Sequence, residues 1–353
     1  MQKIKINLGP KTYDIEIEAG ILEKIGGKIK EFVHGEKIAI ITDTNVDPIY
    51  GEILENSLKK EDYIVQRIVF KAGEQSKNLQ VLEKVYSELS DFGLTRSDLI
   101  ITLGGGVTGD LGGFAAATFL RGVDFIQVPT SLLAQIDSSV GGKVAVDLPS
   151  GKNLVGNFYQ PKAVYIDPKL LKTLPKKYLH DGFAEAIKYS CIRDIELFEK
   201  FESMSTDEDI INYSEEIIFR CCSIKGKIVE GDEFDKGERM VLNFGHTIGH
   251  AVEKYYGFNK YTHGEGVGIG MIRITSTTEK LNITEKGTTE RIKNLLEKFN
   301  LPTSVTLKSC DIHEIIKMDK KKSGSKITIV LLKKLGQGEL LKIDFKNIGE
   351  YII

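Results

Sequence analysis

The sequence of 353 residues has few cysteines, little net charge and no long apolar run. No uninterrupted apolar stretch approaches the roughly 18 residues that a membrane-spanning helix needs. The four cysteines show no Cys-x-x-Cys pair and no disulfide spacing, so we expect reduced, mostly buried thiols in a cytoplasmic protein. The formal net charge of −2 gives no general attraction to nucleic acid or to an anionic membrane. We therefore expect neither kind of partner.

The composition is typical of a folded globular protein. Hydrophobic residues make up 41% and charged residues 28% of the chain, and its length exceeds what one hydrophobic core usually organises. We therefore expect two domains. The first twenty residues alternate apolar and polar side chains and turn at Gly9-Pro10, which predicts a β-hairpin and not a signal peptide.

Strand and helix patterns alternate in the first half of the chain. The expected strands are 37–43, 63–70, 98–103 and 123–128, and the expected helices are 78–92 and 111–119. This alternation is typical of a mostly parallel, doubly wound sheet. We predict an α/β domain over residues 1–176.

Helical periodicity dominates the second half. The expected helices are 183–190, 195–201, 214–229, 241–256, 264–281 and 288–299, and a late hairpin candidate covers 327–332. Pro175 marks the change of pattern and Pro302 follows the last helix. We predict a second domain, all-α in class, over residues 177–353.

A glycine-rich run follows the strand expected at 98–103. It reads LGGGVTGDLGG, and Gly104, Gly106 and Gly109 match the pattern Gly-x-Gly-x-x-Gly. A dinucleotide fingerprint also needs an acid about 20 residues later, at the end of the next strand. That strand ends in Pro129-Thr130, and the acid that does end a strand is the earlier Asp43. The run is either a pyrophosphate turn in a non-standard order or a tight turn that packs a helix on a sheet.

Three of the six histidines lie close together in the sequence. His246 and His250 are separated by four residues on an expected helix, so they share one face, and His263 follows. This spacing suits a metal site with His263 as a plausible third ligand. The alternative is a set of core or capping histidines. The pattern is not His-Glu-x-x-His, so it does not support a zincin protease.

Other charged residues are open to two interpretations. Glu185 lies three residues before Lys188, which fits either a surface ion pair or a half-buried carboxylate ligand beside an ammonium. The segments 137–143 and 150–153 are expected as polar loops, each with a lysine, that suit phosphate or carboxylate oxygens or are simply solvated. The segment 318–325 is expected to be a basic turn.

Nine segments together resemble the 3-dehydroquinate synthase family of sugar-phosphate cyclases. They are AGEQSKN (72–78), GGGVTGDLGGFAAATFLRG (104–122), QVPTSLLAQIDSSVGGKVAVD (127–147), GKNLVGNFYQP (151–161), LKTLP (171–175), GFAEAIKY (182–189), RMVLNFGHTIGHAVE (239–253), HGEGVGIGM (263–271) and MDKKKSG (318–324). They occur in the family's order along nearly the whole chain, which makes the resemblance highly specific.

The resemblance implies an NAD-dependent, metal-dependent carbon–oxygen lyase. Such an enzyme converts 3-deoxy-D-arabino-heptulosonate 7-phosphate to 3-dehydroquinate and phosphate in the shikimate pathway. The steps are transient oxidation, phosphate elimination, re-reduction and an intramolecular aldol reaction. The implied fold is an N-terminal α/β nucleotide-binding domain and a C-terminal helical domain with the site between them, in a homodimer.

The resemblance also implies binding residues. The divalent metal, zinc or cobalt, would be held by Glu185, His246 and His263, with His250 facing the substrate instead. The NAD residues would be Asp43, Glu74, Lys77, Gly105, Gly106, Val107, Thr108, Gly109, Asp110, Thr130, Ser131, Lys143, Lys152 and Thr173.

Cations would hold the substrate, a small phosphorylated sugar acid. The resemblance assigns its carboxylate to Arg239, Lys225 and Asn243, and its ring hydroxyls to Asp137, Lys143 and Lys188. It assigns the phosphate to Lys152, Asn153, His250, Arg121 supplied by the partner subunit, and either Lys320 or Lys321.

Three other functions compete with this one. A 2-deoxy-scyllo-inosose synthase has a substrate without a carboxylate, so Arg239 and Lys225 argue against it. A polyol dehydrogenase of the glycerol dehydrogenase type would produce net NADH. A non-catalytic binding protein would not need the metal and cation residues that this chain carries.

Overall fold

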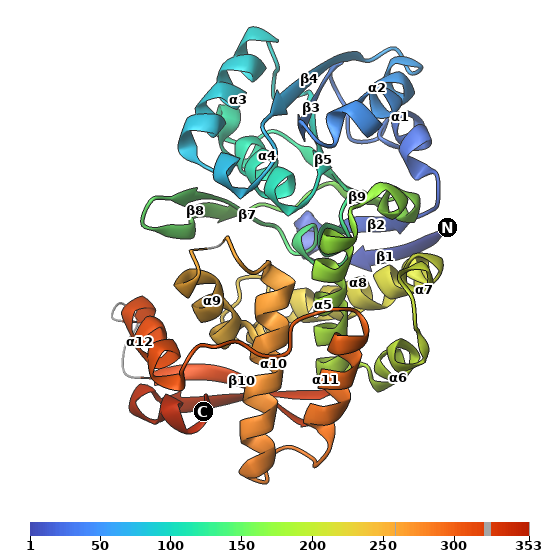
Figure 1. Ribbon diagram of the computed structural model, residues 1–353. Helices are drawn as coiled ribbons and strands as arrows, with labels where there is room; N and C mark the ends of the chain where they lie inside the picture. Colours follow the sequence, from blue (N-terminus) through green and yellow to red (C-terminus); the bar gives the residue numbers. More distant parts are fainter. Residues whose placement is uncertain (258, 321–325, 353) are drawn as a thin grey trace. The chain divides into compact units, whose positions relative to one another are not determined.

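The computed structural model describes residues 1–257, 259–320 and 326–352, without the side chains of 309 and 318–320 (Figure 1). It divides into two compact units. The first comprises Met1–Leu174 and Ser214–Phe234, and the second comprises Pro175–Tyr213 and Asp235–Ile353. A single boundary after residue 176 therefore does not describe the division.

The helix α8 (Ser214–Gly231) explains this difference, because it packs on the first strand of the sheet. A Cβ atom on Gly226 would lie 2.5 Å from Cδ1 of Ile6, so the helix backbone lies close against that strand. The carboxylate of Glu230 accepts hydrogen bonds from the backbone and side-chain N–H groups of Asn7.

A seven-stranded sheet with the order β1-β2-β9-β6-β5-β3-β4 forms the centre of the first unit. Its strands are β1 (Gln2–Ile6), β2 (Tyr13–Ile17), β3 (Lys37–Asp43), β4 (Ile64–Phe70), β5 (Leu99–Gly104), β6 (Phe125–Pro129) and β9 (Ala163–Ile166). Only β1 and β2 pair antiparallel, as the N-terminal hairpin. The other neighbouring pairs are parallel, which agrees with the predicted sheet.

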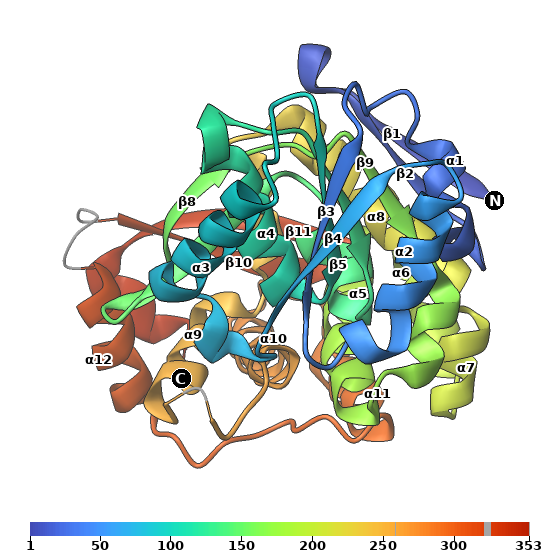
Figure 2. The same cartoon turned by 90° about the horizontal axis from the view of Figure 1, so that it is seen from above.

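Helices cover both faces of this sheet. The helices α1 (Ile25–Lys28) and α2 (Glu52–Lys59) lie on one face, and α3 (Leu79–Asp91) and α4 (Gly106–Thr118) on the other (Figure 2). Ile38 and Ile40 of β3 belong to the core on the first face, whereas Ala39 and Ile41 belong to the core on the second. A strand buried on both faces reads as a continuous apolar run, which is how β3 appears in the sequence.

The helix α4 begins at Gly106, five residues before the predicted start at Leu111. Gly106, Gly109, Gly112 and Gly113 are therefore helical, because packing on the sheet overrides their low helix propensity. Strand β6 begins at Phe125 and includes Pro129, which was expected to follow it.

A second hairpin covers most of the loop expected at 150–153 and begins at the last residue of the loop expected at 137–143. It pairs β7 (Lys143–Leu148) antiparallel with β8 (Gly151–Phe158). The apolar alternation of Val144 and Val146, both buried, is a strand signal that the polar flanks concealed.

The second unit is mainly helical. Its helices are α5 (Lys176–Arg193), α6 (Ile195–Ser203), α7 (Asp207–Asn212), α9 (His246–Tyr255), α10 (His263–Lys280), α11 (Thr288–Lys298) and α12 (Ser309–Lys320). The strands β10 (Lys326–Lys334) and β11 (Gln337–Asp344) form a hairpin where 327–332 predicted one. The rings of Phe201 and Phe299 pack edge-on against Phe183 at 4.8 and 4.6 Å. No helix within the described residues is both long enough and apolar enough to cross a bilayer.

The predicted single helix 241–256 was wrong. A 3-10 turn (Glu238–Asn243) precedes α9, and the chain bends at Gly245, which has a φ of 81°. A Cβ atom at Gly245 would lie 2.6 Å from the carbonyl oxygen of Val267, so only glycine fits. The bend makes His246 the first residue of α9.

Candidate functional site

Three neighbouring parallel strands in the first unit end at the same edge of the sheet. Their last residues are Asp43 of β3, Gly104 of β5 and Pro129 of β6. Thr42 pairs with Leu103, and Gly104 pairs with Pro129. Ligands of doubly wound proteins bind at such carboxyl edges, where the strand order reverses.

Asp43 lies next to the glycine run in space although it precedes the run by a long stretch of sequence. One carboxylate oxygen accepts backbone N–H groups of Asn45 and Val46 at 2.9 and 3.2 Å. The other accepts the hydroxyl of Thr108 at 3.1 Å. The order of the motifs along the chain thus differs from the fingerprint, but an acid and a helix N-terminus still meet at one edge.

Different glycines of the run fit the two interpretations that the sequence left open, a pyrophosphate turn and a turn that packs a helix on the sheet. A Cβ atom on Gly109 or Gly112 would lie 2.8 Å from Gln127 or 2.6 Å from Thr102, so these glycines pack α4 on the sheet. Gly105 precedes α4 and makes no side-chain cap. An uncapped helix N-terminus at a carboxyl edge suits a phosphate.

A buried lysine connects three of the residues expected to bind NAD or substrate. The ammonium of Lys77 lies 2.5 Å from a carboxylate oxygen of Asp110 and 2.5 Å from the amide oxygen of Asn153. Burial raises the pKa of Asp110, although the charge of Lys77 opposes this effect. Burial would lower the pKa of Lys77, but the nearby carboxylates of Asp110 and Glu74 outweigh burial and raise it. Glu74 in turn lies 3.4 Å from the ammonium of Lys152.

The other predicted residues of the first unit are scattered among local contacts. Lys225 forms an ion pair with Asp137 and also donates to its carbonyl oxygen at 2.8 Å. The backbone N–H of Thr130 donates to Gly104, and the hydroxyl of Thr173 lies 2.5 Å from that of Tyr50. Three further predicted residues are Ser131, which follows β6, and the exposed Lys143 and Arg121.

In the second unit, two histidines face one carboxylate. The Nε2 atoms of His246 and His263 each lie 3.4 Å from Oε1 of Glu185. One donor atom from each residue lies within 4.8 Å of the others. The side chain of Glu185 is completely buried. The structure therefore brings together, from α5, α9 and α10, the three residues expected to hold a metal.

The two imidazoles differ in their electrostatics. Burial lowers the pKa of His246 to about 3, with Lys188 adding to the effect, so this ring is neutral near pH 7. Burial also disfavours charge on His263, but hydrogen bonds and charges from Glu185 and Glu253 outweigh it and raise the pKa well above its ordinary value. A neutral imidazole is the form that binds a metal, so a metal would displace a proton from His263.

Glu185 and Lys188 do form an ion pair, but not on the surface. The ammonium of Lys188 lies 2.5 Å from Oε2 of Glu185, and the two side chains are 1% and 0% exposed. The ammonium also lies 4.4 Å from the centre of the Tyr189 ring. A buried ammonium beside a buried carboxylate indicates a functional arrangement more than a stabilising one.

The exposed His250 does not join this set. Among the described residues its candidate metal group is instead His250, Glu253 and His263. The ring of His250 lies 5.4 Å from that of His246, edge to face. Among the described residues, His246 occurs only in the candidate group with Glu185 and His250 only in the group with Glu253, so these two histidines do not share a candidate metal group.

Comparisons with known proteins identify the family of the chain. The family model described as 3-dehydroquinate synthase N-terminal matches residues 67–181, and the model described as 3-dehydroquinate synthase C-terminal matches residues 182–322. The chain belongs to the 3-dehydroquinate synthase family.

A relative from Clostridium acetobutylicum, named 3-dehydroquinate synthase, is 55% identical over 100% of this chain and 99% of its own. A solved structure of 2-deoxy-scyllo-inosose synthase with carbaglucose-6-phosphate, NAD+ and Co2+ has a TM-score of 0.88 at 25% identity over 99% of both chains. A solved 2-epi-5-epi-valiolone synthase from Streptomyces hygroscopicus, 22% identical, has a TM-score of 0.86 over 95% of this chain and 94% of its own, and shows the same fold.

The remaining residues expected from the 3-dehydroquinate synthase resemblance have different positions. Arg239, which is 2% exposed, and the exposed Asn243 both lie on the 3-10 turn before α9. Lys320 ends α12, and its side chain is outside the described part of the structure, as is the whole of Lys321.

Sequence reasoning missed two acids beside the histidines. Asp181 accepts the backbone N–H of Gly264 at 2.5 Å, one residue after His263. Nδ1 of His263 lies 3.5 Å from Oε1 of Glu253. Glu253 follows His246 by seven residues, and this helical spacing could have revealed it.

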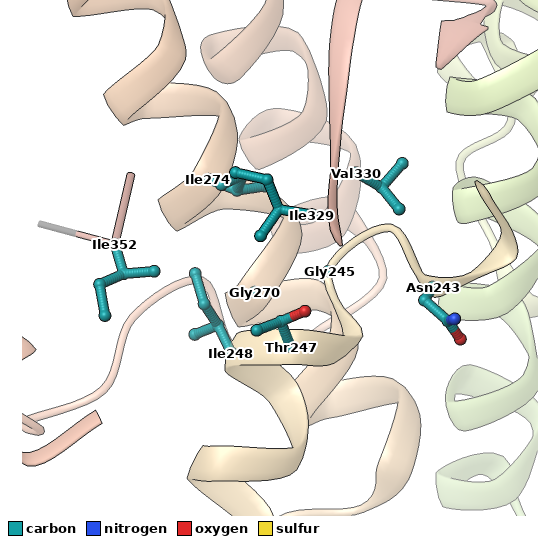
Figure 3. Close-up of a pocket in the computed structure, with 9 residues that line it drawn as sticks. All are labelled: Asn243, Gly245, Thr247, Ile248, Gly270, Ile274, Ile329, Val330 and Ile352. Atoms are coloured by element: carbon teal, nitrogen blue, oxygen red, sulfur yellow. The ribbon is translucent and has the colours of Figure 1, made fainter. Parts of the chain in front are cut away.

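The second unit contains a small pocket whose lining does not include the three residues expected to hold a metal. Its lining is mostly apolar and comes from the 3-10 turn, α9, α10, β10 and the C-terminal segment (Figure 3). Ile248, Ile274 and Ile329 contribute to it, and Asn243 is the one predicted site residue that lines it. The metal set and the lysines do not line this pocket.

Proposed function

We propose that the chain is a lyase that converts 3-deoxy-D-arabino-heptulosonate 7-phosphate to 3-dehydroquinate and phosphate, with NAD and one divalent metal. The convergence of Glu185, His246 and His263 carries the proposal. The proposal is also supported by the family, whose members are named for this reaction.

The three residues fit zinc or cobalt. A carboxylate oxygen and two imidazole nitrogens are common zinc ligands, and three protein ligands are the usual number in a catalytic site. Oε1 of the completely buried Glu185 faces both Nε2 atoms, while Oε2 is paired with the ammonium of Lys188. The 2-deoxy-scyllo-inosose synthase and valiolone synthase structures hold Co2+ and Zn2+, respectively.

The carboxyl edge of the sheet fits NAD. We propose that the uncapped N-terminus of α4 binds the pyrophosphate and that Asp43 binds the adenine ribose. Thr108 and Lys77 hold the acids Asp43 and Asp110 by hydrogen bonds. The other proposed contacts are Glu74, Gly105, Gly106, Val107, Gly109, Thr130, Ser131, Lys143, Lys152 and Thr173.

Cations and polar groups are proposed to bind the substrate. Arg239 suits its carboxylate because a guanidinium can bind both oxygens, and Lys225 and Asn243 complete that set. Asp137, Lys143 and Lys188 are proposed for the ring hydroxyls. The phosphate is assigned to Lys152, Asn153, His250, Lys320 or Lys321, and Arg121 supplied by the partner subunit.

The reaction needs little acid–base machinery from the chain. Held by Glu185, His246 and His263, a metal would supply polarisation of a substrate hydroxyl, and NAD at the carboxyl edge would supply reversible hydride acceptance without net NADH. The chain's own residues orient the substrate and stabilise developing charge. We propose that Lys188, whose ammonium lies beside Glu185, holds a substrate hydroxyl close to the metal ligands.

Phosphate release tests the function. Purified protein is incubated with the heptulosonate phosphate, Zn2+ and NAD+ at one hundredth of the substrate concentration. We expect one phosphate per substrate and no accumulation of NADH. Stoichiometric NADH formation from an alcohol without phosphate release would instead identify a polyol dehydrogenase.

The same assay separates the chain from 2-deoxy-scyllo-inosose synthase. That protein resembles this one in fold and was solved with a glucose 6-phosphate analogue that has no carboxylate. We expect no phosphate release from glucose 6-phosphate. Turnover of glucose 6-phosphate in preference to the heptulosonate phosphate would reverse the assignment.

We also propose that the enzyme is a cytoplasmic homodimer, which rests on the family resemblance. All four cysteines are free thiols, and Cys191, Cys221 and Cys222 are buried. Light scattering coupled to gel filtration should give twice the mass of one chain, and a single-chain mass would contradict the dimer.

A further inference from the structure

The imidazole of His263 lies between two carboxylates. Its Nε2 atom is 3.4 Å from Oε1 of Glu185, and its Nδ1 atom is 3.5 Å from Oε1 of Glu253. The side chain of Glu253 is 6% exposed. Each edge of the ring therefore faces a buried acid, but only Glu185 belongs to the proposed metal set.

The close packing of α9 on α10 places Glu253 beside the ring. A Cβ atom on Gly249 would lie 2.9 Å from the carbonyl carbon of Gly266, so the two helix backbones meet there. A Cβ atom on Gly266 would lie 3.4 Å from Cγ of Glu253. The acid's aliphatic carbons therefore pack along α10, and its carboxylate reaches the first residue of that helix.

His246 has the same arrangement with a different acceptor. Its Nε2 atom lies 3.4 Å from Glu185, and its Nδ1 atom lies 3.1 Å from the carbonyl oxygen of Phe244. Both rings thus present Nε2 to the shared carboxylate and have an oxygen acceptor at Nδ1. In metal sites, such an acceptor fixes the tautomer and the orientation of the ligating ring.

We propose that Glu253 is a positioning residue that accepts the Nδ1–H of His263 and so directs Nε2 toward the metal. The inference rests on the proposed metal set and adds a residue that does not touch the metal. It explains why a buried carboxylate lies on the far side of the ring. The competing explanation is a second metal held by His250, Glu253 and Nδ1 of His263, whose donor atoms lie within 4.8 Å of one another.

Two substitutions test whether Glu253 acts as a hydrogen-bond acceptor or only fills space. Glu253→Leu keeps a similar volume but removes the acceptor, whereas Glu253→Gln keeps an oxygen that can accept Nδ1–H. By competition with a chelator, we expect Glu253→Leu to weaken zinc binding about 10- to 100-fold and Glu253→Gln to weaken it less than about tenfold. The visible spectrum of the Co2+-loaded protein should change in the Leu variant and stay close to wild type in the Gln variant.

Glu279→Gln is the matched control. Glu279 lies on α10, the helix that begins at His263, and accepts the backbone N–H of Thr289 at 2.5 Å, away from the histidines. We expect this variant to retain zinc affinity and the cobalt spectrum. If the Leu variant does not fold, Glu253→Asp replaces it, because the shorter side chain withdraws the carboxylate from Nδ1.

The number of zinc ions bound per chain shows whether the metal set itself or only the proposed role of Glu253 is wrong. Wild type should bind one zinc, and Glu185→Gln should bind it much more weakly. Loss of zinc binding in wild type would remove the metal set and the proposed function with it. One zinc in wild type and unchanged affinity in Glu253→Leu would overturn only the role of Glu253. Two zinc ions in wild type and one in Glu253→Leu would favour the second metal site instead.

Discussion

Lys77 and Asp110 form a buried ion pair that links α4 to the segment before α3. The ammonium lies 2.5 Å from the carboxylate, and the two side chains are 5% and 19% exposed. The pair lies beside the glycine run of the proposed NAD site, where burial raises the pKa of Asp110 and Lys77 opposes this effect. We therefore expect the contact to matter both for stability and for NAD binding.

Replacement of this lysine should affect both roles. In Lys77→Met we expect the free energy of unfolding to fall by about 1–3 kcal/mol, because a largely buried carboxylate loses its partner. The dissociation constant of NAD should also rise. Urea unfolding and isothermal calorimetry measure the two effects. Lys59→Met, which removes the exposed pair with Glu55, should change neither. A stability loss with unchanged NAD affinity would make the pair purely structural.

The two histidines of α9 should respond differently to substitution. His246→Ala should lose bound zinc, because it removes one of the two Nε2 atoms that face Glu185. His250→Ala should retain zinc but lose turnover. Metal analysis after gel filtration measures the content. Equal zinc loss in both variants would instead support His246 and His250 as two ligands of the same metal, as their helical spacing alone suggests.

Arg239 should be sensitive even to lysine. The proposed contact with a carboxylate uses two guanidinium nitrogens, which an ammonium cannot reproduce. We expect Arg239→Lys to raise KM for the heptulosonate phosphate roughly 10- to 100-fold, the equivalent of one lost charged hydrogen bond. Arg193→Lys, at a partly exposed arginine paired with Glu238, is the control and should leave KM unchanged. An unaltered KM in both variants would exclude Arg239 from substrate binding.

Asp98 should make stability depend on pH. Its carboxylate accepts backbone N–H groups of Lys37 and Thr95 at 3.0 and 2.7 Å. Burial alone would raise its pKa, but these hydrogen bonds outweigh burial and lower the pKa below its usual 3.8. A lowered folded-state pKa adds stability above about pH 4, and this stability is lost as the pH falls through the folded-state value.

Asp98→Asn should therefore lower the free energy of unfolding at pH 7 by about 1–3 kcal/mol, because the amide turns an N–H group toward former donors. Urea unfolding at several pH values should show the difference from wild type shrinking toward pH 3. Asp91→Asn, on the exposed end of α3, should change stability little. A difference independent of pH would show that the charge of Asp98 is not responsible.

Several elements could be predicted because their signals are local. The strand β3 was predicted at its exact bounds, since a doubly buried strand is a continuous apolar run between polar residues. The bend between the 3-10 turn and α9 was not, because it results from the approach of Gly245 to α10, which no local pattern reports. The hairpin β7–β8 was missed because polar, glycine-containing flanks hid its alternation.

In the candidate site, too, local signals could be predicted and features that depend on tertiary packing could not. The spacing of His246 and His250 suggested a metal site with both as ligands, but the structure groups His246 with Glu185 and His263, since helical periodicity says nothing about α5 or α10. The residues alone suggested His263 as a third ligand and left the role of Glu185 open, and only the family resemblance gave the full set. Glu253 was missed by both. Its spacing from His246 places it on the same helix face, but its approach to His263 depends on how closely two helices pack.

The sequence by itself determined the kinds of elements, their order and the chemical groups available, because hydrophobic period and residue type are local properties. The tertiary structure decided which groups meet. It brought Asp43 to the glycine run by pairing β3 with β5, and it turned two imidazoles toward Glu185 by packing α9 and α10 against each other and α10 against α5. Such neighbours depend on long-range packing, which can bring together residues from any two points of the chain.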